Sequence, residues 1–138
     1  MSYLRLYSSF LLFLKASVNS FKYFFSFWLN SFYFSLSLLL LVFVWLQVFS
    51  IYSKTKDDLL IFHYTVDFGI DLIGDANLIF ILSILASFFS ALNFILALVL
   101  SEKKHYKLIW HFLGISTILI NIFILLSLYS VNLINFPS

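Results

Sequence analysis

Apolar residues are arranged along this chain in three long runs that contain no Asp, Glu, Lys or Arg. The runs cover residues 23–53, 76–101 and 108–138. About 20 mostly apolar residues suffice for a helix to cross the hydrocarbon core of a bilayer, and each run is longer than that. The pattern therefore predicts an all-α integral membrane protein with a single membrane domain over residues 1–138. Its three transmembrane helices are expected at residues 31–52, 77–100 and 109–131.

The segment before the first span has a different pattern. At 100° per residue its polar side chains fall on one broad face and its apolar side chains on the other. Lys15 and Lys22 interrupt the apolar residues, so residues 1–30 are predicted to form an amphipathic interfacial helix rather than a further span. Such a helix can lie in the headgroup region or pack on a partner subunit, because both roles need the same apolar stripe.

The basic residues predict how the spans are oriented. Of the eight Lys and Arg residues, three precede the first span, three lie in or next to the loop 101–108, and two lie in the loop 53–76. Short loops rich in Lys and Arg stay in the cytoplasm. The N-terminus and the loop 101–108 are therefore expected in the cytoplasm, and the loop 53–76 and the tail 132–138 outside.

Composition supports the membrane class and limits the chemistry. Hydrophobic residues make up 63% of the chain and charged residues 10%, whereas soluble domains carry about 25% charge. The net charge of +2 is too small to indicate a nucleic-acid partner. Because there is no cysteine, disulfides, thiolate chemistry and iron–sulfur ligation are excluded. No catalytic or cofactor-binding pattern is recognisable, so we expect a protein that is not an enzyme and has no cofactor.

Small residues recur every four positions on the second predicted helix, at Ser83, Ser87 and Ala91. Small side chains allow helix backbones to approach closely in lipid, where packing drives association. The pattern predicts a helix-packing face, directed either at the third helix or at another subunit. The alternative is that Ser and Ala are simply common in spans.

Amide side chains also lie within the spans. Asn93 and Asn121 are near mid-membrane, and Gln47 is a third candidate of this kind. An unpaired amide in hydrocarbon costs several kcal/mol, so Asn93 and Asn121 are predicted to hydrogen-bond each other and to hold the second and third helices together. A path for a polar substrate is the alternative interpretation.

The outer loop contains the most distinctive local sequence. Residues 62–71 alternate between apolar and polar side chains or glycine, which is a strand signal, and Asp75 is a candidate cap for the second helix. If the segment is extended, His63, Asp67 and Asp71 share one edge and could hold zinc or manganese. Their spacing matches no recognised metal signature, and a solvated polar edge explains the same residues. We therefore predict no metal site and keep these three residues as candidates.

The same loop resembles one found in small bacterial proteins. His63-Tyr64 and Phe68-Gly69-Ile70-Asp71-Leu72-Ile73-Gly74 precede a helix with Asn93-Phe94-Ile95-Leu96-Ala97. Over residues 33–136 the sequence is similar to an uncharacterised family of three-span membrane proteins with a His-Tyr…Phe-Gly-x-Asp-x-x-Gly outer loop. Phe62 and Thr65 stand where that family often has proline and asparagine. A fainter likeness is to membrane domains linked to toxin immunity. The resemblance implies the fold and a bacterial origin, and it carries no activity or functional residue.

Two functional hypotheses follow. The first is a non-catalytic accessory or structural subunit of a larger membrane complex, with lipid and other membrane subunits or further copies of itself as partners. The alternative is a membrane sensor, an immunity protein or a protein that binds a small solute or metal, acting through the outer loop 61–75. The expected location is the bacterial inner membrane, and the mitochondrial inner membrane is the alternative.

Overall fold

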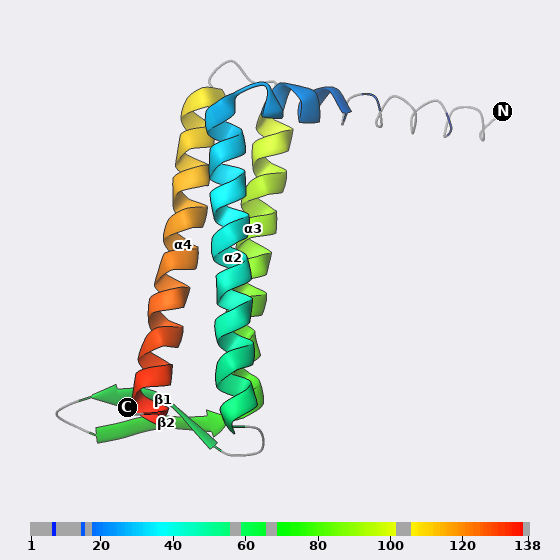
Figure 1. Ribbon diagram of the computed structural model, residues 1–138. Coiled ribbons are helices and arrows are strands. Elements are labelled where there is room, and N and C mark those ends of the chain that lie inside the picture. Colours follow the sequence, from blue (N-terminus) through cyan, green and yellow to red (C-terminus); the bar gives the residue numbers. More distant parts are fainter. Residues whose placement is uncertain are drawn as a thin grey trace.

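The computed structural model describes residues 7, 15, 18–55, 59–65, 69–101 and 106–136. Three long helices stand side by side and form a bundle (Figure 1): α2 (Trp28–Thr55), α3 (Phe80–Leu100) and α4 (Tyr106–Asn135). α3 is preceded by the short 3₁₀ helix η1 (Ala76–Ile79). All three helices are long and apolar enough to cross a membrane, so the prediction of three spans is confirmed.

Helices α2 and α4 extend beyond the predicted spans. α2 has 28 residues and α4 has 30, because both helices continue past the apolar core into its polar borders. A lysine near an end of each helix rests on an aromatic ring, with Lys54 Nζ 5.2 Å from the centre of the Phe136 ring and Lys107 Nζ 5.2 Å from that of Phe27. These cation–π contacts hold each lysine against the protein. The helix can therefore include a charged residue that the hydropathy pattern places outside the span.

A two-stranded antiparallel hairpin crosses one end of the bundle (Figure 1). It consists of β1 (Leu59–Thr65) and β2 (Gly69–Asp75), so the alternating segment does form strands. Leu60 is fully buried against a cluster that also contains Val48, Ile51 and Leu128. The hairpin is therefore anchored to the helices by an apolar side chain that closes this end of the bundle.

The opposite end of the bundle is closed by the chain that precedes α2. Residues 18–25 are helical and lie crosswise over the ends of the spans (Figure 1). Phe24 is only 2% exposed, in a cluster with Ala97, Tyr106 and Trp110. The Asn30 amide donates a hydrogen bond of 3.1 Å to the Phe24 carbonyl and fixes the turn between the two helices.

Much of the predicted amphipathic segment 1–30 lies outside the described residues, as do parts of the loops 53–76 and 101–108 and of the tail 132–138. Where the segment is described, its apolar face meets the bundle, because the Phe21 and Phe24 rings both contact the ring of Phe94. The expected cap at Asp75 is only partly present. Asp75 occupies the N-cap position of η1, but its side chain makes no capping hydrogen bond.

Candidate functional sites in the helix bundle

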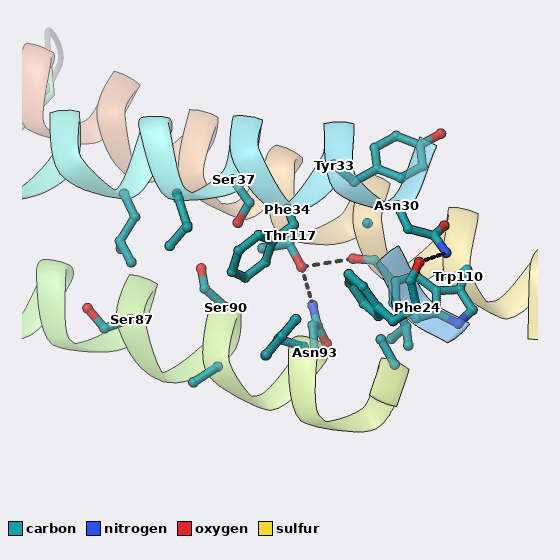
Figure 2. Close-up of a pocket in the computed structure, with 17 residues that line it drawn as sticks. Phe24, Asn30, Tyr33, Phe34, Ser37, Ser87, Ser90, Asn93, Trp110 and Thr117 are labelled. Atoms are coloured by element: carbon teal, nitrogen blue, oxygen red, sulfur yellow. Dashed lines mark hydrogen bonds between the residues drawn. The ribbon is translucent and has the colours of Figure 1, made fainter. Parts of the chain in front are cut away.

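A cavity of about 290 Å³ lies between the three helices. Its walls come from α2, α3 and α4, and Phe24 and Trp110 line it on the side of the N-terminal helix (Figure 2). The volume is close to the lower limit of small-molecule pockets, which is about 300 Å³. Serine, threonine and asparagine side chains project into this otherwise apolar space; those drawn are Asn30, Ser37, Ser87, Ser90, Asn93 and Thr117.

Asparagine side chains connect α3 to α4 near the middle of the two helices. The Asn93 amide donates to the hydroxyls of Ser116 and Thr117, at 3.2 and 2.9 Å. The Asn121 amide donates to Ser90 Oγ at 3.2 Å. Each asparagine thus binds hydroxyls on the facing helix rather than the other asparagine. Both contacts join α3 to α4, with serine and threonine hydroxyls as the acceptors.

The small residues of α3 face different surroundings. Ser83 is fully buried, and Ser87 accepts a hydrogen bond of 3.1 Å from the Trp45 indole of α2. Ala91 lines the cavity but is exposed on its outer side. The packing face proposed at Ser83 and Ser87 is therefore used inside the chain, where α3 meets its own neighbours.

α2 and α4 approach each other closely at the end of the cavity that lies toward the N-terminal helix. A Cβ atom on Gly114 would lie 2.8 Å from the Tyr33 ring, a distance that real Cβ atoms do not adopt. The Tyr33 hydroxyl lies 3.0 Å from His111 Nδ1 in a hydrogen bond. This contact joins α2 to α4 through His111.

The hairpin is connected to α4 by a contact that the sequence did not suggest. Asn135 Oδ1 accepts a hydrogen bond of 2.9 Å from the Ile61 N–H, and Asn135 Nδ2 donates one of 2.8 Å to the Ile61 carbonyl. The side-chain amide thus pairs with the strand as a neighbouring backbone amide would. At the end of a predicted span, an asparagine resembles any polar tail residue, so no pattern could identify this role.

The candidate metal ligands His63 and Asp71 lie on the two paired strands of the hairpin and not along one extended strand. His63 is exposed in β1 and pairs in register with Leu72, the neighbour of Asp71 in β2. Asp67 lies outside the described residues. Among the residues that are described, no group of three or more histidine and acidic side chains is placed to hold a metal ion.

One amide lies on the outer surface of the bundle. Gln47 of α2 is exposed, and it makes no hydrogen bond with the part of the chain that the structure describes. It is eight residues from the end of α2, which is about 12 Å at the helical rise. A hydrocarbon core of about 30 Å centred on this helix would include the Gln47 side chain.

No protein-family model, no curated protein and no solved structure matches this chain. The contacts of the bundle itself therefore carry the functional argument.

Proposed function

We propose that this protein is a non-catalytic accessory or structural subunit of a larger membrane complex. The observation that carries the proposal is the exposed amide of Gln47. In water an exposed glutamine is ordinary, but lipid tails offer neither a donor nor an acceptor. Polar side chains within spans form hydrogen bonds across helix interfaces, so Gln47 marks the side of α2 on which a further helix fits.

The surroundings of Gln47 suit such a contact. Phe43, one turn earlier on the same face, is 49% exposed, and Ser50 nearby is exposed as well. The face thus combines a large apolar side chain with a hydroxyl and an amide. A helix from another subunit, or from a second copy, would cover the aromatic ring and satisfy the amide together.

The proposed setting is the bacterial inner membrane, with the N-terminus and the loop 101–108 in the cytoplasm. The support for this orientation is the excess of Lys and Arg before α2 and between α3 and α4. The hairpin then lies on the outer surface.

The experiment places a photoreactive amino acid at Phe43 in the full chain and irradiates native membranes. A crosslink to a defined membrane protein, or to a second copy, is expected. Gln47→Leu preserves most of the volume and removes the amide, so the yield should fall by about 3- to 20-fold, as for loss of one interhelical hydrogen bond. Leu46→Ala is the matched control, because it changes the neighbouring exposed residue without removing a polar group.

Crosslinks to lipid alone would contradict the proposal. So would a protein crosslink whose yield is the same with glutamine and with leucine at position 47.

A further inference from the structure

The cavity is not fully enclosed by the helices. Two of its lining residues, Leu38 of α2 and Ala91 of α3, are exposed, Leu38 by 46%, so the cavity is open beside them, between α2 and α3. Leu38 is ten residues from the start of α2, or about 15 Å along it. The opening between α2 and α3 therefore faces the hydrocarbon region, and what enters it comes from the bilayer.

Several polar groups of the lining have unused hydrogen-bonding capacity. Ser37 is only 9% exposed and makes no hydrogen bond with the described residues. Asn93 uses its amide hydrogens, but its Oδ1 accepts nothing from that part of the chain. Ser90 accepts from Asn121 and has no described acceptor for its own proton. Figure 2 shows the Ser37 and Ser90 hydroxyls directed into the space between α2 and α3.

This lining distinguishes between classes of ligand. All 17 described residues that line the cavity are uncharged, so an ionic headgroup would be held in hydrocarbon without a countercharge. A plain hydrocarbon chain would leave Ser37 Oγ and Asn93 Oδ1 unpaired, at the cost of buried polar groups. A neutral head with a hydroxyl or carbonyl group satisfies both requirements.

We propose that the cavity binds an uncharged lipid by its hydroxyl- or carbonyl-bearing head. Ser37, Ser90 and Asn93 bind the polar group, and the aromatic rings of Phe34 and Phe94 contact the first part of the chain. The cavity volume is smaller than a complete lipid, so the remainder of the chain leaves through the opening between Leu38 and Ala91 and lies among the bilayer lipids. This site is independent of the contact proposed at Gln47.

The test uses the full chain in lipid nanodiscs and a photoreactive analogue of monooleoylglycerol, which is a neutral lipid with a hydroxyl head. Saturable labelling of peptides from α2 and α3 is expected, with displacement by unlabelled monooleoylglycerol or by an isoprenoid quinone. The more effective competitor shows whether a hydroxyl or a carbonyl is preferred. A photoreactive phosphatidylglycerol, which is anionic, should label without saturation.

Three variants locate the site. Ala91→Trp fills the opening and should abolish saturable labelling, whereas Leu92→Trp introduces the same side chain at the neighbouring exposed residue and should preserve it. Ser37→Ala removes one hydroxyl that the described residues do not use, so it should leave the fold intact and weaken binding by about 2- to 10-fold, the value of one hydrogen bond. If Ala91→Trp fails to fold, the binding measured for Ser37→Ala still tests the proposed site.

The proposal is overturned if labelling is not saturable, which would leave a cavity that holds only water or passing lipid tails. It is also overturned if the anionic probe saturates at the same residues, or if Ser37→Ala binds as tightly as the unaltered chain.

Discussion

The two hydrogen bonds between Asn135 and Ile61 give the sharpest test of how the hairpin is held. Asn135→Leu is the informative change, because leucine has the same number and branching of side-chain heavy atoms as asparagine and no polar atom. It removes an acceptor 2.9 Å from the Ile61 N–H and a donor 2.8 Å from the Ile61 carbonyl. Each such bond contributes about 0.5–1.5 kcal/mol net. The hairpin should therefore lose about 1–3 kcal/mol of its stability against local opening.

Hydrogen exchange measures this opening directly. When a segment recloses faster than it exchanges, each 1.4 kcal/mol lost raises the exchange rate about tenfold. Amides of β1 and β2 should thus exchange about 5- to 150-fold faster in the variant. Amides in the middle of α3 should be unchanged, because Asn135 contacts only the hairpin and its own helix.

Asn132→Leu provides the matched control. Asn132 is the same residue type, three positions earlier on α4, and its contact is a longer one of 3.4 Å with the exposed Lys54. Exposed contacts of this kind contribute little, so hairpin exchange should change by less than about threefold. Equal exchange in the two variants would refute the reasoning, and it would mean that Leu60 and the helix cluster hold the hairpin without help from Asn135.

Two further predictions concern the other end of the bundle and the orientation. Phe24→Ala should lower the free energy of unfolding in mixed micelles by about 3–5 kcal/mol, as for a buried aromatic side chain, whereas Phe21→Ala, whose ring is 43% exposed, should cost far less. Similar losses for both variants would show that Phe24 does not close the bundle. In intact cells a tag after Ser138 should be accessible from outside and a tag before Met1 should not, as the distribution of Lys and Arg requires. The reverse accessibility would invert the proposed topology.

The three spans were predictable because the absence of charge over more than 20 residues is a property of composition and needs no knowledge of packing. The hairpin was partly predictable for a related reason. Alternation from Phe62 onward has the period of a strand, and it does form β1 and β2. What alternation cannot show is the fold-back, which places His63 and Asp71 on two paired strands.

The cavity was not predictable, because α2 is apolar around almost its whole circumference. Ser35 and Ser37 are alike in sequence, yet Ser35 is exposed and Ser37 is buried beside the cavity. In a soluble helix the polar face indicates which side is outward. In a helix surrounded by lipid that signal is lost, so only the packing of the three helices shows which serine faces inward. For the same reason the amides of Asn93 and Gln47 look equivalent in the sequence. In the structure Asn93 faces the interior of the bundle, whereas Gln47 is exposed on its outer surface.

The bundle is closed by large apolar side chains at both ends, and the polar groups that line the cavity lie between them. Leu60 and Phe24 occupy the ends, so within the described residues the proposed exit for a bound lipid is the lateral opening at Leu38. Gln47 and Ser37 are ten residues apart on α2, about 15 Å along the helix, and substitutions at that separation usually act independently. Loss of the Phe43 crosslink in Gln47→Leu should therefore leave lipid labelling intact, and Ser37→Ala should leave the crosslink intact. If each variant lost both, a single disturbance of α2 would explain the two effects, and neither site would stand.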